Sequence, residues 1–231
     1  MLEVKGLNQF YGGCHTLWNV DLSVPDGSLI CVMGRNGMGK TTLLKCIMGL
    51  VKVTSGSITF GEIDLINCPP EERAKIGIGY VPQGRDIFPH LTVEENLRLG
   101  LGVRKNGARA IPQRIFNLFP GLKEMLNRRG GDLSGGQQQQ LAIGRALVLE
   151  PRLLILDEPT EGIQPNIVHE IGNIILKLNK EEGVAVLLVE QKLPFARRVA
   201  NEFCILTNGR LVTAGQIGEL TDEIVRAHLS V

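Results

Sequence analysis

The sequence has few aromatic residues and almost no net charge. Phe, Trp and Tyr make up 4% of its 231 residues, and 25 Lys and Arg against 24 Asp and Glu leave a net charge of +1. A chain so close to neutral has no broad electrostatic attraction for nucleic acid. We therefore expect no nucleic-acid partner, and any anion site must be local.

Cysteine clusters and long apolar runs are also missing. The five cysteines are scattered, with no CxxC pair and no Cys/His cluster at metal-ligand spacing, which excludes a zinc site and fits a reducing compartment. No apolar run approaches the roughly 20 residues that span a bilayer, and the first residues, MLEVKGLNQFYGG, lack the apolar core of a signal peptide. We expect the chain to stay inside the cell unless another subunit carries it to a membrane.

Glycine and short apolar runs are abundant instead. The 28 glycines and 43% apolar residues are typical of an α/β protein with tight turns. Apolar runs at residues 29–33, 153–156 and 184–189 predict buried strands, and helical spacing over residues 165–180 predicts a crossover helix. The order predicts a parallel sheet with helices between its strands.

Other segments predict smaller elements. Alternation from Trp18 to Val24 predicts a strand with one buried face, and Thr92 to Glu95 forms a capping box that begins a helical region. Near the end, residues 203–207 and 210–213 around Asn208-Gly209 predict a hairpin, followed by a closing helix over 216–229. We expect one domain over residues 1–231, with a core of 1–90 and 150–231 and a helical subdomain of about 91–149.

A phosphate-binding loop lies between a predicted strand and a predicted helix. GRNGMGKT fits GxxxxGK[ST] in full. Backbone N–H groups of such a loop surround phosphate oxygens, Lys40 reaches the outer phosphates, and the Thr41 hydroxyl can bind Mg²⁺. A glycine-rich turn without this function need not carry Lys and Thr at those two places. The predicted binding residues are Gly34, Arg35, Asn36, Gly37, Met38, Gly39, Lys40, Thr41 and Thr42.

Two carboxylates end the apolar run RLLILDE. Asp157 is predicted to hold Mg²⁺ through water, and Glu158 to orient and deprotonate the attacking water. The alternative is an acidic strand end before the turn at Pro159-Thr160. Together with the loop around Lys40, the catalytic interpretation is favoured.

The segment LSGGQ predicts a second anion-attracting helix start. Ser134 and Gln137 form a capping box for a helix that runs to about Leu149. Because the loop at Lys40 already covers the phosphates from one side, this glycine-lined helix end is predicted to face the γ-phosphate of another bound nucleotide. An ordinary capped helix gives no reason for both Gly135 and Gly136.

GRNGMGKTT, LSGGQ and LLILDE, in this order, resemble the ATP-binding subunits of ABC transporters over essentially the whole chain. The resemblance implies a P-loop NTPase fold with a mixed or parallel sheet, an N-terminal antiparallel subdomain and a helical subdomain, with ATP and Mg²⁺ as cofactors. It also implies that Tyr11 stacks on adenine, that Gln83 contacts Mg²⁺ and senses the γ-phosphate, and that Ser134 to Gln137 complete the opposite subunit's site. Without the family, Tyr11 is equally a half-buried aromatic beside a turn.

Two positions depart from the general family pattern. Gln191 stands where most members carry a switch histidine, and an amide can hydrogen-bond a γ-phosphate but cannot carry a proton. Gln164 stands where members usually have Asp. Both resemble importers of branched-chain amino acids and related small polar solutes.

Within that subgroup, residues 83–89, 158–168 and 191–198 resemble the second ATP-binding subunit of urea importers. The resemblance therefore favours urea as the solute, with branched-chain amino acids or short-chain amides as alternatives. No residue here touches the solute, because specificity lies in the membrane and solute-binding subunits.

The resemblance implies several partners. These are a paired ATP-binding subunit in a heterodimer (a homodimer in isolation is possible), transmembrane permease subunits at the cytoplasmic face of the membrane and, indirectly, a periplasmic or extracellular solute-binding protein. Two rivals stay open. A soluble ABC-type assembly ATPase fits the length, and a regulator that binds nucleotide without hydrolysis is disfavoured by Glu158 but allowed by Gln191.

Overall fold

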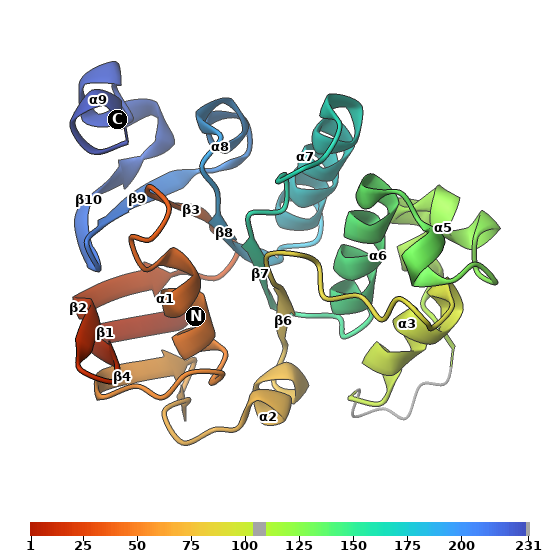
Figure 1. The fold of residues 1–231 in the computed structure, drawn as a ribbon, viewed down its shortest axis with the longest axis horizontal. Coiled ribbons are helices and arrows are strands. Elements are labelled where there is room, and N and C mark those ends of the chain that lie inside the picture. The colour runs from red at the N-terminus through yellow and green to blue at the C-terminus, as the bar shows by residue number, and fades with distance from the viewer. Residues whose placement is uncertain (104–109, 230–231) are drawn as a thin grey trace.

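An antiparallel sheet of four strands begins the chain in the computed structural model, which describes residues 1–103 and 110–229. The strand order is β2-β1-β4-β5 (Figure 1). The strands are β1 (Leu2–Tyr11), β2 (Cys14–Val24), β4 (Ser55–Phe60) and β5 (Ile63–Asp64). This sheet confirms the expected antiparallel N-terminal part.

The predicted burial pattern of β2 is wrong at its first position. The later apolar positions are buried, but Trp18 is 39% exposed and Leu17 is buried in its place. Asn19 has a φ of 46°, and the β1–β2 register shifts between the pairs formed by Val20 and Leu17. The extra residue of such a bulge turns the preceding side chain to the other face.

A six-stranded sheet forms the second layer, in the order β10-β9-β3-β8-β7-β6. Its strands are β3 (Leu29–Met33), β6 (Ile78–Val81), β7 (Leu153–Asp157), β8 (Ala185–Val189), β9 (Glu202–Thr207) and β10 (Arg210–Gln216). All neighbours are parallel except β10, which forms the predicted hairpin with β9. The carboxyl ends of β3, β7 and β8 therefore meet at one edge, where open α/β sheets bind ligands.

Alternate residues of β3 supply two hydrophobic cores. Leu29, Cys31 and Met33 belong to the core that contains α6 and α7, and Ile30 and Val32 belong to the core shared with α1 and the antiparallel sheet. Because successive side chains of a strand point to opposite faces, a strand covered on both sides is apolar throughout. This explains the continuous apolar run that predicts the strand.

Helices cover both faces of the parallel sheet (Figure 1). The bounds of those outside the helical insert are α1 (Lys40–Ile47), α2 (Pro70–Lys75), α7 (Pro165–Lys180), α8 (Leu193–Val199) and α9 (Asp222–His228). The bounds of α7 agree with the prediction. The predicted closing helix is only partly right, because β10 continues to Gln216 and a short 3₁₀ turn, η2 (Ile217–Glu219), precedes α9.

The segment between β6 and β7 is helical among its described residues. It contains α3 (Val93–Leu101), α4 (Gln113–Leu118), α5 (Pro120–Glu124), η1 (Gly130–Asp132) and α6 (Gly135–Leu147). The predicted capping box is present, since Thr92 Oγ1 accepts from Glu95 N at 3.1 Å and Glu95 Oε2 accepts from Thr92 N at 2.8 Å. The division into a core and a helical subdomain stays a prediction.

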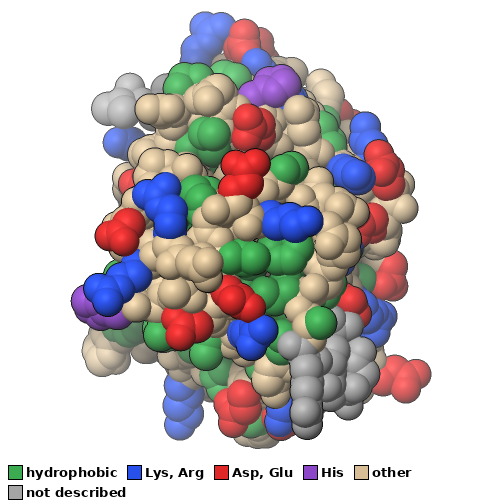
Figure 2. All heavy atoms as spheres, turned by 90° about the vertical axis from the view of Figure 1, so that its right-hand side faces the viewer, with side chains coloured by type: hydrophobic (Ala, Val, Ile, Leu, Met, Phe, Trp, Pro, Cys, Tyr) green, Lys and Arg blue, Asp and Glu red, His purple; other side chains and the backbone are tan. Residues whose placement is uncertain are grey.

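Figure 2 shows the face that carries this helical part, on the right of Figure 1. Hydrophobic side chains gather near its centre, with Lys, Arg, Asp and Glu side chains around them. Phe88, before α3, and Leu99, within α3, are large apolar side chains of this part that stay exposed. Among residues 1–103 and 110–229, no helix combines the length and apolar character needed to cross a membrane.

Candidate active site

The loop between β3 and α1 is held in a closed curve by its own lysine. Lys40 Nζ donates to the carbonyl oxygens of Gly34 at 2.8 Å and Arg35 at 2.9 Å, and the side chain is 4% exposed. Gly34 must be glycine, because a Cβ there would lie 2.4 Å from the Leu206 carbonyl oxygen. The backbone of the loop therefore lies at the edge of the sheet, and the ammonium group of Lys40 is buried against it.

A pocket of about 320 Å³ opens beside this loop. It is lined by Thr16, Asn36, Gly37, Gly39, Lys40, Thr41, Thr42, Gln83 and Glu158. Eight of these nine residues belong to the predicted site, and the structure brings them together from β3, α1 and the ends of β6 and β7. Thr16, in β2, is the addition.

Asp157 is a buried carboxylate at the end of β7. Burial raises its pKa from 3.8 to about 6, opposed by a hydrogen bond from Thr41 and by the charge of Lys40. Apart from the nearby Thr41 hydroxyl, neither carboxylate oxygen has a well-aligned donor among the described residues. A buried carboxylate that lacks donors beside a hydroxyl is a donor set that Mg²⁺ fits, because this ion prefers oxygen ligands.

Glu158, the next residue, adopts a backbone conformation that is uncommon for glutamate. Its φ is 49°, and its N–H donates to the Val189 carbonyl oxygen at 2.9 Å. Oε1 lies 3.5 Å from Lys40 Nζ. Left-handed residues other than glycine cost free energy and occur where the surrounding structure imposes them, often at functional sites. The turn directs the carboxylate back toward the loop.

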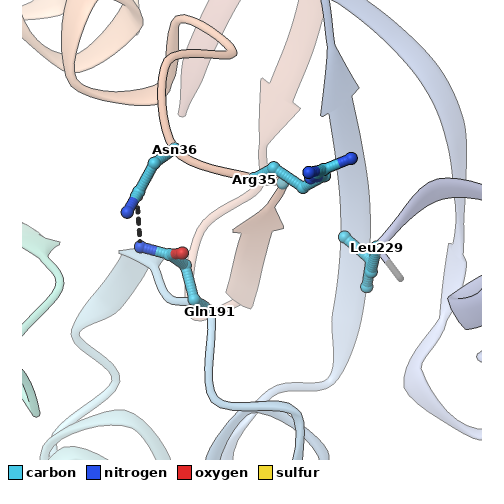
Figure 3. Close-up of a pocket in the computed structure, with 5 residues that line it drawn as sticks. Arg35, Asn36, Gln191 and Leu229 are labelled. Atoms are coloured by element: carbon cyan, nitrogen blue, oxygen red, sulfur yellow. Dashed lines mark hydrogen bonds between the residues drawn. The ribbon is translucent and has the colours of Figure 1, made fainter. Parts of the chain in front are cut away.

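Gln191 follows β8 and contacts both sides of the pocket. Its Nε2 donates to Asn36 Oδ1 at 2.7 Å and to Glu158 Oε1 at 2.5 Å. Figure 3 shows the bond to Asn36. Both residues line a second pocket, of about 340 Å³, together with Arg35 and Leu229. The Gln191 amide therefore lies against the predicted base.

Gln83 points toward the loop that follows Glu158. Its Nε2 donates to Glu161 Oε2 at 3.0 Å, while the residue also lines the 320 Å³ pocket. Its predicted contact with Mg²⁺ stays a prediction.

The Ser134 segment forms the capped helix start that the sequence predicts. Ser134 Oγ accepts from Gln137 N at 3.4 Å, and Gln137 Oε1 accepts from Ser134 N at 2.9 Å. The space around both glycines is limited within the chain. A Cβ at Gly135 would lie 3.2 Å from the flexible Arg85 guanidinium, and one at Gly136 3.0 Å from Ile167. Packing on Ile167 is therefore a second reason for a small residue at Gly136, and the predicted role of both glycines at a nucleotide stays a prediction.

Tyr11 is outside the pocket lining. It ends β1 and is 49% exposed. Beside it, Phe10 stacks on His15 and His15 on Trp18, with centroid distances of 3.9 and 3.5 Å. The stacking of Tyr11 on adenine stays a prediction.

Besides Thr16, sequence reasoning missed two features of the site. Glu190, at the end of β8, is 2% exposed and accepts a 2.6 Å hydrogen bond from the Thr160 hydroxyl. Gly209 N donates to the Met38 carbonyl oxygen at 3.0 Å, so the β9–β10 turn supports the phosphate loop. A signal for Glu190 exists, since a glutamate that ends a wholly apolar strand must find donors once buried.

Comparison with known proteins places these features in a family. The sequence model of a family described as ABC transporter matches residues 17–161. The branched-chain amino acid transport ATP-binding protein BraG of Pseudomonas aeruginosa is 41% identical over 92% of this chain and 91% of its own. A probable branched-chain amino acid transport ATP-binding protein, LivF of Archaeoglobus fulgidus, is 38% identical over 96% and 94%.

Solved structures agree with this similarity. The dimeric post-hydrolysis state of the ATP-binding cassette MJ0796, bound to ADP and Pi, superposes with a TM-score of 0.84 at 28% identity. The match covers 94% of this chain and 99% of that one. The sheets, the loop around Lys40 and the helical part thus form a known cassette architecture, as the sequence predicts.

Proposed function

Since this chain belongs to the ABC transporter family, we propose that its pocket beside Lys40 binds ATP with Mg²⁺ and that Glu158 activates the water that cleaves the terminal phosphate. The chain is an ATP-binding and ATP-hydrolysing subunit. The observation that carries the residue assignment is that Lys40 and Gln191 both contact Glu158 beside this pocket, at the carboxyl ends of three neighbouring parallel strands.

Each side chain has a separate task in this proposal. Thr41, Asp157 and Gln83 would hold Mg²⁺, which supplies positive charge against the phosphate oxygens. Lys40 already lies at the loop and needs only to exchange its contact with Glu158 for phosphate. Glu158 then becomes free to accept a proton from water, and Gln191 holds its oxygen in position.

The Ser134 to Gln137 segment would complete the site of a paired ATP-binding subunit. The MJ0796 cassette is described as dimeric, which supports this arrangement. ATP favours the closed pair only if its γ-phosphate has contacts from both subunits in that state. Hydrolysis removes those contacts and the pair reopens.

The helical face in Figure 2 would transmit this motion to permease subunits at the cytoplasmic side of a membrane. Hydrophobic side chains gather on that face, and Phe88 and Leu99 in this part are exposed. Arg145 holds the Phe88 segment by donating to the Asp86 carbonyl oxygen at 2.7 Å and by lying over the Phe88 ring. The segment follows Gln83 directly, so a change at the pocket would move it.

We assign import of branched-chain amino acids as the transport function. The names of BraG and LivF state branched-chain amino acid transport at 41% and 38% identity. Urea is supported only by the resemblance of residues 83–89, 158–168 and 191–198 to urea importers, and it is therefore tested as the alternative solute. A pull-down from solubilised membranes, followed by ATPase assays with leucine, urea and acetamide, distinguishes the solutes. Stimulation by urea alone would replace the amino-acid assignment, and recovery without permeases would favour a soluble ATPase.

Glu158→Gln tests the catalytic assignment. The amide keeps the shape of the side chain but accepts no proton, so phosphate release should fall by about 100-fold or more while ATP still binds. Binding is measured with a fluorescent ATP analogue, and the exposed Glu170→Gln is the control. Normal turnover in Glu158→Gln would remove Glu158 from the role of base.

A further inference from the structure

Glu190 joins the two loops that carry the catalytic groups. It follows β8, as Glu158 follows β7, and the two strands pair in parallel with Asp157 opposite Val189. The chain leaves the sheet at the same level in both places. Beyond these points the sheet no longer pairs the two segments, so side-chain contacts hold the loops together.

The connection is a closed ring of hydrogen bonds built on two buried residues, Glu190 and Thr160. Glu190 Oε2 accepts from the Thr160 hydroxyl at 2.6 Å, and Oε1 accepts from the backbone N–H of Gln191 at 2.8 Å and of Lys192 at 3.0 Å. Lys192 Nζ then returns to the Thr160 carbonyl oxygen at 2.7 Å. Thr160 is fully buried and Glu190 nearly so, whereas Lys192 is exposed. The bond between Thr160 and Glu190 therefore lies away from solvent competition.

We propose that Glu190 is a positioning residue for hydrolysis, which fixes Gln191 against Glu158 by tying the loop after β8 to Thr160. The inference rests on the proposed roles of Glu158 and Gln191. Thr160 is two residues beyond Glu158, and the Gln191 backbone is held directly by the Glu190 carboxylate. One side chain therefore contacts both loops that bear the 2.5 Å contact between Gln191 and Glu158.

The ring acts on geometry, and it reaches the phosphate-binding loop only through the Gln191 contact with the Asn36 side chain among the described residues. Lys40 and the backbone of residues 34–39 have their own support from β3 and from the β9–β10 turn. Loss of Glu190 should therefore lower kcat and leave KM for ATP nearly constant. A displacement of about 1 Å in a reacting group can cost a factor of about 100 in rate, so an effect of this kind is measurable.

The test compares Glu190→Ala, Glu190→Gln and Thr160→Val in the purified chain. Alanine should lower kcat by more than about tenfold, with ATP affinity within about threefold. Glutamine should restore most of the rate, because its oxygen can accept from both N–H groups and its nitrogen can donate to the Thr160 hydroxyl. Thr160→Val keeps the shape of the side chain and removes the hydroxyl donor. It should show part of the loss in kcat, and it provides the test if the alanine variant does not fold.

Asn179→Ala is the matched control for stability. Asn179 is also buried and donates to the carbonyl oxygens of Gly27 and Val184 at 2.8 and 3.0 Å, away from the pocket. Its loss should lower the melting temperature without changing kcat. A purely structural Glu190 would behave in the same way, and that result would overturn the inference.

A double-mutant cycle separates positioning from an independent contribution. Because Glu190 acts through Gln191 and Glu158, the effects of Glu190→Ala and Gln191→Ala should be strongly non-additive. If the fold-loss in kcat of the double variant equals the product of the two single losses, the inference is wrong. It is also wrong if Glu190→Ala folds and its turnover stays within about twofold of wild type. If Glu158→Gln itself is fully active, the proposed function fails first; if it is inactive and Glu190→Ala is active, only the role of Glu190 fails.

Discussion

The side-chain nitrogen of Gln191 lies 2.5 Å from Glu158 Oε1, and the same nitrogen donates to Asn36 Oδ1. One amide therefore joins the phosphate-binding loop to the carboxylate that we assign as the base. The amide has two N–H donors and does not titrate near neutral pH. It can orient Glu158 without competing for the proton that Glu158 must accept.

Replacement of Gln191 tests whether positioning is its whole task. Gln191→His should leave phosphate release within about threefold, because a neutral ring keeps one N–H donor toward the site. Gln191→Ala removes both contacts, and its rate of phosphate release should fall by more than about tenfold. Gln113→Ala, at an exposed position of α4, is the control. A large gain in Gln191→His would mean that the amide impairs the native site.

Lys40→Ala should lose tight ATP binding for two reasons. The variant removes the cation aimed at the outer phosphates, and it removes the two hydrogen bonds that curve the loop onto Gly34 and Arg35. Titration with a fluorescent ATP analogue should show a fall in affinity of more than about tenfold, since charge-assisted bonds to phosphate are strong. The exposed Lys52→Ala should bind as wild type. Unchanged affinity in Lys40→Ala would refute the loop assignment.

Local patterns in the sequence predict much of the site. The loop at Lys40, the carboxylates after β7 and the capping boxes at Thr92 and Ser134 each depend on residues a few positions apart, so their spacing contains the information. The apolar runs likewise predict β3, β7 and β8, because strands covered on both faces have no polar alternation.

Contacts between distant segments are absent from those patterns. The bond from Thr160 to Glu190 spans 30 residues, and the packing of Gly136 on Ile167 joins α6 to α7. The exposure of Trp18 depends on a bulge at Asn19, where one extra residue reverses the faces of β2. Such features follow from the assembled sheet and could not be predicted from periodicity.

Gly209→Ala should weaken both the fold and ATP binding. Gly209 has a φ of 73°, and a Cβ there would lie 2.0 Å from the Thr16 carbonyl oxygen. Its N–H supports Met38 in the phosphate loop and its carbonyl accepts from Trp18 N at 2.8 Å. Urea denaturation should show a loss of about 2 kcal/mol or more, with weaker ATP binding in the same variant.

Gly183→Ala is the matched control for Gly209. Gly183 has a similar φ of 68°, but a Cβ there meets nothing within 4 Å. This variant should lose only the backbone component, about 1 kcal/mol, and keep its ATP affinity. Equal losses in the two variants would show that the contact with Thr16 and the support of Met38 contribute nothing.

Asp157→Asn should stabilise the nucleotide-free protein at neutral pH. The carboxyl has a pKa of about 6 in the folded chain against 3.8 as its ordinary value. The unfolded chain therefore releases this proton first, and the free energy of unfolding falls as pH rises from about 4 to about 6. Above that range the folded protein keeps a charged, buried carboxylate, which lowers the free energy of unfolding by up to about 3 kcal/mol. Asparagine carries no charge, so the variant does not lose this stability.

Thermal denaturation in EDTA at pH 5 and pH 7.5 measures this difference. The gain in melting temperature of Asp157→Asn over wild type should be several degrees at pH 7.5 and smaller at pH 5, where wild type is mostly protonated at this position. The exposed Asp26→Asn should show no such pH-dependent gain. With Mg²⁺ and ATP the wild type should have the higher melting temperature. The cation neutralises the wild-type carboxylate and binds the amide of the variant more weakly. A variant that is less stable than wild type in EDTA at both pH values would show that Asp157 already has adequate partners in the folded chain, and it would remove the argument that this carboxylate is arranged for a cation.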